Sequence, residues 1–190
     1  MPRNGEDARQ RLRHAALELF VENGFDQTTA AQIAARAGVT ERTFFRHFPD
    51  KREVLFDGQN ILGTALSEAI GKAPPELTPM QTLHRAFASM VEMLERNRRY
   101  SEPRQRVISS TPALQERELA KGAAITRAVA EALQRRGVEK QRANLAAQAG
   151  LAALGYALDA WFADASLPLG DYLDRAFVEL QQLSSPIAPR

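Results

Sequence analysis

The sequence contains no cysteine. Disulfide bonds, thiolate zinc sites and cysteine nucleophiles are therefore excluded. Strand signals are also scarce, because no run of alternating β-branched residues occurs, whereas helix signals repeat along the whole chain. The sequence therefore predicts an all-α protein.

A strong excess of charge is missing as well. The net charge is +2, and residues 1–52 contain nine Lys and Arg against seven Asp and Glu. Any nucleic-acid surface must therefore come from the local placement of a few side chains and not from a basic domain. The first eleven residues contain no apolar run, so we expect no signal peptide and a cytoplasmic protein, associated with the nucleoid when it binds DNA.

The N-terminal part contains the signals of three short helices. The spacing of Leu12, Ala16, Leu19 and Phe20 predicts one buried face of a first helix, which ends at Gly24. A second helix opens at a capping box of Thr29 and Gln32 and runs to Ala37, and Gly38 forms a turn. Thr40 can cap a third helix, whose inward residues are Phe44 and Phe48.

This pattern is typical of a helix-turn-helix, in which the N-terminal residues of the last helix reach base edges in the major groove. Arg42 is suited to guanine and Glu41 to cytosine, whereas Thr29, Thr43, His47 and Lys51 are suited to phosphates. The alternative is a plain helical hairpin with a solvated charged face. The full set of predicted DNA-binding residues is Thr29, Thr40, Glu41, Arg42, Thr43, Phe45, Arg46, His47 and Lys51.

Further helices are predicted after residue 50. A capping box of Asp50 and Glu53 opens a fourth helix, and Lys72–Pro79 forms a linker. The next helix starts at Thr78-Pro79, with a buried stripe of Leu83, Phe87, Met90, Val91 and Leu94. Pro103 is expected to interrupt the helical structure before a short helix over 104–109. A longer helix is predicted from Thr111-Pro112 to Gly137.

The segment Leu145–Ala163 is apolar on all sides, which indicates burial on more than one face or a membrane span. We favour burial, with a partner subunit on one face, because small residues permit close helix approach. A last amphipathic helix follows, so two helices per subunit could form a four-helix dimer interface. Its predicted residues are Ala149, Gly150, Ala153, Ala157, Leu173, Phe177 and Leu180.

A small-molecule site in the C-terminal part is a further hypothesis. Arginines crowd residues 96–106, and they form either a solvated helix end or the basic mouth of a pocket for an anionic effector. The apolar candidates fit a protein core equally well. The predicted effector-binding residues are Phe87, Met90, Met93, Tyr100, Arg106, Trp161 and Phe162. The three histidines have no partner at metal-ligand spacing, and we expect no metal and no cofactor.

Residues 10–56 resemble the DNA-binding domain of the TetR/AcrR family of transcriptional regulators. The resemblance lies in Gly24-Phe25, Thr28-Thr29, Ile33-Ala34, Ala37-Gly38-Val39 and the segment from Thr43 to Lys51. It implies nine or ten helices, a homodimer built on the last two, and a ligand pocket in the C-terminal body. Phe45 departs from the family, which usually has a tyrosine that contacts phosphate there, so Phe45 is expected to contact sugar or a thymine methyl.

The C-terminal part is more weakly similar to mycofactocin-system regulators, around Arg106-Val107-Ile108 and residues 111–117. That similarity implies an acyl-CoA-type or other anionic apolar effector. We therefore predict a helix-turn-helix DNA-binding domain over residues 1–52 and a helical effector-binding and dimerisation domain over residues 53–190.

The predicted function is a transcriptional regulator, specifically a dimeric repressor that an effector releases from a palindromic operator. In this mechanism the effector makes the fourth helix reposition the two DNA-binding domains. One alternative is a dimeric DNA-binding protein without an effector. Another is an enzyme that uses the C-terminal body, although the sequence offers no nucleophile with a neighbouring base.

Overall fold

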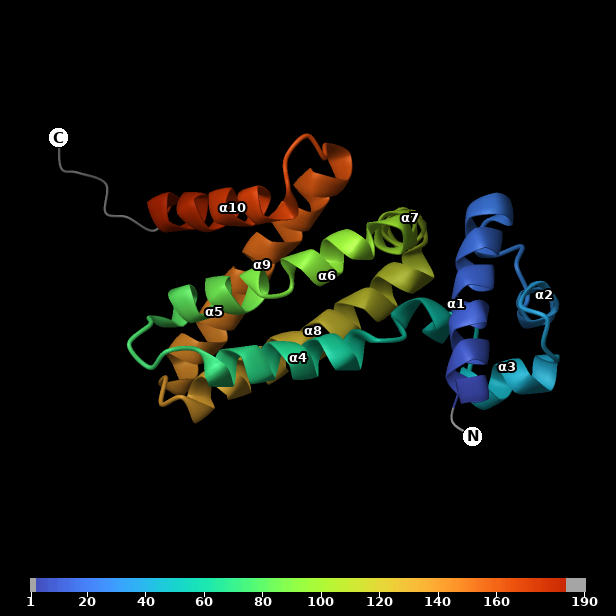
Figure 1. The fold of residues 1–190 in the computed structure, drawn as a ribbon, viewed down its shortest axis with the longest axis horizontal. Coiled ribbons are helices and arrows are strands. Elements are labelled where there is room, and N and C mark those ends of the chain that lie inside the picture. Colours follow the sequence, from blue (N-terminus) through green and yellow to red (C-terminus); the bar gives the residue numbers. More distant parts are fainter. Residues whose placement is uncertain (1–2, 184–190) are drawn as a thin grey trace. The chain divides into compact units, whose positions relative to one another are not determined.

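The computed structural model describes residues 3–183, and within this range it contains ten α-helices, one 3₁₀ helix and no strand (Figure 1). The all-α prediction is therefore confirmed. The elements are α1 (Arg3–Asn23), α2 (Ala30–Arg36), α3 (Glu41–His47), η1 (Glu53–Phe56), α4 (Gln59–Lys72), α5 (Pro79–Ala88), α6 (Val91–Arg96), α7 (Arg98–Ser109), α8 (Pro112–Arg135), α9 (Lys140–Ala163) and α10 (Leu169–Leu183).

The helices form two compact units. The first unit comprises residues 3–59 and 97–121, and the second comprises residues 60–96 and 122–183. The helix α8 contributes its N-terminal part to the first unit and its C-terminal part to the second. Packing thus divides the chain differently from the functional boundary predicted after residue 52, which remains a prediction.

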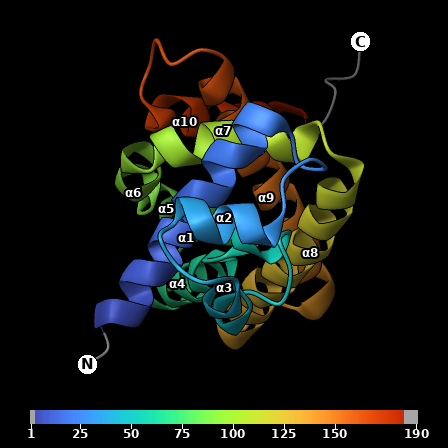
Figure 2. The ribbon, with the colours of Figure 1, turned by 90° about the vertical axis from the view of Figure 1, so that its right-hand side faces the viewer.

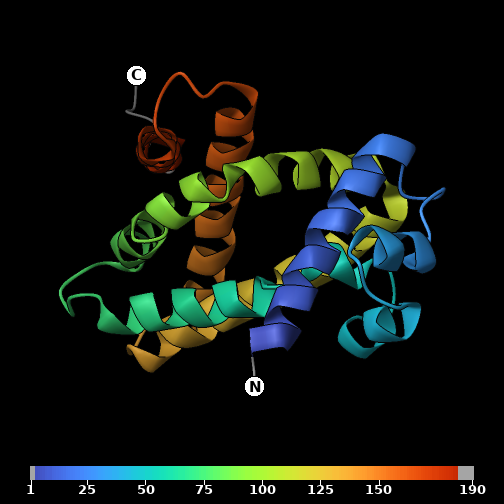
Figure 3. The same cartoon turned by 45° about the vertical axis from the view of Figure 1, so that its right-hand side comes forward.

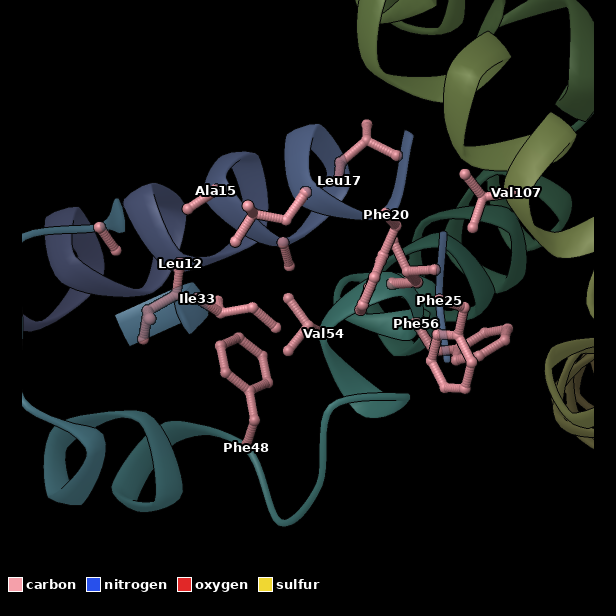
Figure 4. Close-up of a cluster of buried hydrophobic side chains, with 14 of the residues drawn as sticks. Leu12, Ala15, Leu17, Phe20, Phe25, Ile33, Phe48, Val54, Phe56 and Val107 are labelled. Carbon is pink, nitrogen blue, oxygen red and sulfur yellow. The ribbon is translucent and has the colours of Figure 1, made fainter. Parts of the chain in front are cut away.

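The core of the first unit explains this division. Leu12 and Phe20 of α1 pack with Ile33, Phe48 and Val54 in one buried cluster (Figure 4). The same cluster includes three side chains of α7 and one of α8, namely Tyr100, Val107, Ile108 and Leu114. Figure 2 shows α2 beside α1, with α3 following it. The first three helices therefore share their core with α7 and the start of α8, which come much later in the chain.

The chain after α3 differs from the predicted single fourth helix. The 3₁₀ helix η1 ends at Phe56, and Gly58 has a φ of +90°, a conformation that favours glycine, before α4 begins. The Asp50 carboxylate accepts hydrogen bonds from the backbone N–H groups of Arg52 (2.7 Å) and Glu53 (3.1 Å). Glu53 does not reach back, because its carboxylate accepts from Arg117 and Lys121. The continuous helix was therefore wrong, and only half of the predicted capping box forms.

Two more predicted boundaries were wrong. The helix predicted to carry the stripe Leu83–Leu94 ends at Ala88, and α6 starts separately at Val91. Pro103 lies inside α7 and does not interrupt it. A proline in this position removes only the hydrogen bond to the Arg99 carbonyl, and Arg99 is exposed, so water can hydrate that carbonyl.

In the second unit, α9 packs against α5 and α10, and Figure 3 shows α10 end-on beside α9. Gly150 brings α9 close to α5, because a Cβ atom added there would lie 2.7 Å from Cδ1 of Leu83. The Glu139 carboxylate caps α9, and its bonds from the N–H groups of Gln141 and Arg142 lower the pKa of Glu139. The first N–H of α10, at Leu169, donates to Glu95 (2.8 Å).

The α4 C-terminus is held by one arginine. The Arg136 guanidinium donates to the carbonyl oxygens of Ile70 (3.2 Å), Ala73 (2.6 Å) and Pro74 (2.6 Å). These carbonyls lie in the last turn of α4 and in the two residues after it, where a cation is favourable. Over residues 3–183, none of the helices has the length and apolar character needed to span a membrane.

Candidate DNA-binding surface

Local hydrogen bonds fix the turn between α2 and α3. The Thr29 hydroxyl accepts from the Gln32 N–H (3.2 Å), and the Gln32 side chain accepts from the Thr29 N–H (2.8 Å), as the predicted capping box requires. Gly38 has a φ of +67°, and the Val39 N–H donates to the Ala34 carbonyl (2.9 Å). The capping box begins α2, and the Val39 bond closes the turn that leads into α3, so the predicted helix-turn-helix is confirmed.

The hydroxyl of Thr40 begins α3 by accepting from the Thr43 N–H (3.2 Å). Phe44 and Phe48 are buried in the core of the first unit, so the opposite side of the helix is exposed. Residues three and four apart share a helix face. We call the exposed residues Glu41, Arg42, Phe45 and Arg46 the outward face of α3.

Ion pairs involve many of the other charged side chains between α1 and η1. Arg36 binds Glu22 (2.8 Å) and Glu18 (3.3 Å), and the hydrogen bond from Arg36 lowers the pKa of Glu22. Similar pairs join Arg11 to Asp7 and Arg52 to Asp50.

The two arginines of the outward face differ from these. Within the described residues, neither Arg42 nor Arg46 forms an ion pair or a side-chain hydrogen bond. Two guanidinium groups are therefore available on a charge-balanced domain, and they can bind phosphate or guanine.

Lys51 has a structural role that the sequence did not indicate. Its ammonium group donates to the carbonyl oxygens of Phe25 (2.7 Å) and Thr28 (2.9 Å), with Asp26 O at 3.5 Å, and it lies 4.2 Å from the centre of the Phe25 ring. An ammonium has three donors, and the chain satisfies them here. Lys51 thus fastens the α1–α2 turn to the segment after α3, which argues against its predicted use for phosphate.

The surroundings of His47 favour its neutral form. Burial lowers the pKa of His47 from its ordinary value, and the neighbouring Arg46 and Arg9 lower it further. Its Nε2 atom is buried and has no hydrogen-bond partner within the described residues. A phosphate contact from His47 would therefore have to come from a neutral ring.

An ion-pair network around η1 was missed by the sequence interpretation. Arg9 binds Asp57 with two hydrogen bonds (2.5 and 2.9 Å), and Arg13 lies 3.8 Å from the same carboxylate. Arg104 of α7 donates to the Leu55 carbonyl (2.5 Å) and to Glu118 (3.3 Å). No local sequence signal identifies these pairs, because the partners lie far apart along the chain.

The predicted effector-binding residues are divided between the two units, and their grouping into one site remains a prediction. Tyr100 and Arg106 belong to the first unit, where Tyr100 is buried and Arg106 is exposed, and the other five belong to the second unit. Phe87 and Trp161 are buried, and Met93 is exposed. The second unit has an open groove of about 770 Å³ between α8 and α9, which contains none of the predicted residues. The groove is lined by Ala123, Thr126, Arg127, Ala130, Glu131, Gln134, Lys140, Asn144 and Gln148.

Four of the predicted dimer residues are also placed differently. Gly150, Ala153, Ala157 and Leu173 are buried in the core of the second unit, so they cannot form a surface for a partner. The small residues serve close packing within the chain, as Gly150 shows against α5. The other three predicted residues, Ala149, Phe177 and Leu180, are half-buried.

The exposed apolar residues of α9 and α10 are different ones. Leu145 and Tyr156 are 68% and 67% exposed, and Ala152 lies between them. We call Leu145, Ala149, Ala152 and Tyr156 the α9 stripe, since their spacing places them on one side of the helix. Val178 and Leu183 are the exposed large apolar residues of α10, and Val178 is the one within the helix rather than at its end.

Comparisons with known proteins match both parts of the chain. Residues 12–57 match the family model of bacterial regulatory proteins of the tetR family, and residues 77–184 match the MftR C-terminal domain. The transcriptional regulator TcmR of Streptomyces glaucescens is 37% identical over 83 residues, which are 44% of this chain and 37% of TcmR.

Two further proteins are similar over most of their length. MftR of Mycobacterium tuberculosis is 27% identical over 165 residues, covering 85% of this chain and 83% of MftR. The crystal structure of Thermus thermophilus FadR, a TetR family transcriptional repressor in complex with lauroyl-CoA, superposes with a TM-score of 0.60 at 25% identity, covering 96% of this chain and 98% of FadR.

Proposed function

Because this chain belongs to the tetR family of bacterial regulatory proteins and carries an MftR-type C-terminal domain, we propose that it is a homodimeric repressor that a small molecule releases from a palindromic operator. As a member of this family it is a DNA-binding transcriptional regulator and not an enzyme. The operator symmetry, the dimer and the effector are the proposed parts.

The outward face of α3 is the observation that carries the proposal. Capping bonds, the Gly38 turn and buried Phe44 hold the helix, and two unpaired arginines stand on its exposed side. Arg42 lies in the N-terminal half of α3, the part of a recognition helix that contacts base edges. We therefore assign Arg42 to guanine, and Arg46 and Thr43 to phosphate.

The dimer is proposed to form through the α9 stripe together with Val178 of α10. Leu145, Tyr156 and Val178 are large and exposed, and exposed apolar patches mark interaction surfaces. A two-fold axis would set each stripe against its copy, since the same surface serves both subunits in such an interface. The revised interface keeps the predicted helices but uses their outer sides.

The proposed effector class is an acyl-CoA thioester. FadR, which is similar over nearly the whole chain, was crystallised with lauroyl-CoA, and this supports the assignment. The effector must bind the free state more tightly than the DNA-bound state, because a ligand with equal affinity for both shifts nothing. The helix α8 is a candidate to couple effector binding to DNA binding, since it contributes residues to both units.

Selection of bound duplexes from a random pool tests the DNA part of the proposal. We expect an enriched palindrome whose half-sites are about 34–36 Å apart, or a multiple of this spacing. Binding of the selected duplex is then measured with lauroyl-CoA, with CoA and with laurate. Release by lauroyl-CoA but by neither fragment supports the effector class, and a pool without enrichment contradicts sequence-specific binding.

One observation favours the effector-independent alternative. Phe87, predicted to line a pocket, is fully buried among apolar side chains of the second unit. A protein that keeps its affinity for the selected duplex with lauroyl-CoA and with a broad panel of metabolites would fit this alternative.

A further inference from the structure

The outward face of α3 contains one large apolar side chain among its charged neighbours. Phe45 is 52% exposed, although the adjacent Phe44 is fully buried. The two rings meet edge-on, with their centres 5.3 Å apart and their planes at 86°. This contact packs the Phe45 ring against the buried Phe44 ring, so the exposed part of Phe45 is held in place on the outward face of α3.

We infer that Phe45 is a specificity-determining residue that contacts the C5-methyl group of a thymine in each half-site. The inference rests on the proposed function, because it places the outward face of α3 in the major groove. The methyl group of thymine is the apolar feature of the major-groove edges, and phenylalanine is one of the side chains that contact it. A half-exposed ring also gains from losing water when it meets this methyl group.

The chemistry of the ring excludes the usual polar contacts. Phenylalanine has no donor or acceptor, so Phe45 cannot hydrogen-bond a phosphate or the polar edge of a base. Arg42 precedes Phe45 by three residues, about 4.5 Å along a helix axis, and consecutive bases on a strand are about 3.4 Å apart along the duplex. The bound half-site should therefore contain a thymine within about one or two base pairs of the guanine that Arg42 contacts.

Replacing thymine by uracil tests the contact, because it removes the methyl group and leaves the base-pairing groups unchanged. The probe is the duplex obtained by selection, synthesised with thymine and with uracil in its place. We expect the parent protein to bind the uracil duplex more weakly than the thymine duplex. The loss should be about fourfold when one half-site is replaced and on the order of tenfold when both half-sites are replaced. Single replacements along the half-site should locate the loss at one thymine.

Variants distinguish the methyl contact from other roles of the ring. Phe45→Ala should bind the thymine and uracil duplexes with the same affinity. Val21→Ala removes another exposed apolar side chain, on α1, and should keep the parent's preference for thymine. Thermal unfolding shows whether the Phe45→Ala variant is folded. If it is not, Phe45→Leu is measured instead, and it should keep part of the preference for thymine.

Two results would overturn the inference. The first is a parent protein that binds both duplexes equally. The second is a Phe45→Ala variant that weakens both duplexes by the same factor, which would place the ring on a sugar. A parent protein that binds no duplex specifically would instead contradict the proposed function.

Discussion

The outward face of α3 and the α9 stripe both carry large exposed side chains, but their chemistry is opposite. The face on α3 carries two arginines without ion pairs, a glutamate and one aromatic ring, whereas the α9 stripe carries Leu145, Tyr156 and alanines. A surface with free guanidinium groups suits a polyanion, and its binding depends on salt. An apolar stripe suits another protein surface, and burying it depends little on salt.

This difference teaches how a charge-balanced protein can recognise DNA. Acidic side chains neutralise Arg9, Arg36 and Arg52 through ion pairs, and Arg42 and Arg46 keep their charge for the ligand. A half-site contact of a few side chains is weak alone, which is why the proposed function needs the α9 stripe to join two copies. Substitutions on the outward face of α3 should therefore weaken DNA binding directly, whereas substitutions in the α9 stripe should first disrupt the dimer.

The largest effect is expected from a charge in the α9 stripe. Tyr156→Asp places a carboxylate in the proposed dimer interface, where its desolvation opposes association. The protein should sediment as a monomer at micromolar concentration. Affinity for the palindromic duplex should fall by about 10²-fold or more, because the gain from linking two sites is about 10²–10⁴-fold.

Leu119→Asp is the matched control, since Leu119 is also highly exposed but lies on α8. It should remain dimeric and bind DNA as the parent does. A Tyr156→Asp protein that stays dimeric would show that the α9 stripe is not the interface.

Arg42→Ala should have the next largest effect. Loss of a bidentate contact to guanine costs about 1–3 kcal/mol, and preference should relax at one position of each half-site. The dimer should be unaffected, which separates this surface from the α9 stripe. Binding to duplexes with each base substituted in turn measures both quantities, with Arg85→Ala on α5 as the control. Unchanged preference at every position would contradict base contact by Arg42.

The local parts of the DNA-binding surface could be predicted from the sequence. The Thr29–Gln32 box, the Gly38 turn and the Thr40 cap each involve residues at most five positions apart, so their chemistry is visible in the chain itself. The break before α4 also had a local signal that was overlooked, because Gly58 has the positive φ that a turn requires.

The remaining features depend on partners that are distant in the sequence. Lys51 bonds carbonyls more than twenty residues away, and Arg9 bonds Asp57 across 48 residues. A stripe of small residues has the same sequence pattern whether it faces α5 of its own chain, as Gly150 does, or another subunit. Amphipathic spacing indicates that a face is covered but does not identify what covers it.

A smaller effect should come from Lys51→Met, which sharpens the limits of the DNA-facing surface. The variant loses the bonds to the carbonyls of Phe25 and Thr28, and the free energy of unfolding should fall by about 1–2 kcal/mol. The slope of the logarithm of affinity against the logarithm of salt concentration should not change, because the ammonium group binds the chain itself.

Arg46→Met is its counterpart and should behave in the opposite way. Its stability should match the parent's. The salt slope should fall in magnitude by about 0.9 for each phosphate that the protein no longer neutralises, or about 1.8 for a dimer. Equal changes in the salt slope for Lys51→Met and Arg46→Met would mean that Lys51 also contacts phosphate.

The smallest effect concerns His47, at the edge of the outward face. Its pKa in the folded protein is lowered from the ordinary 6.5 by burial and by nearby arginines. Well above pH 6.5 the ring is neutral in both the folded and the unfolded chain, and its titration does not change the free energy of unfolding. As the pH falls through this value the unfolded chain takes up the proton first, so the free energy of unfolding decreases until the folded ring is also protonated. In the His47→Gln variant the part of this decrease in the free energy of unfolding that comes from His47 should vanish. Urea unfolding of the parent and the variant at about pH 7.5 and about pH 5.5 measures the difference. A parent and a variant that lose the same stability over this interval would mean that His47 is not held in its neutral form, and that it can add a positive charge to the outward face of α3.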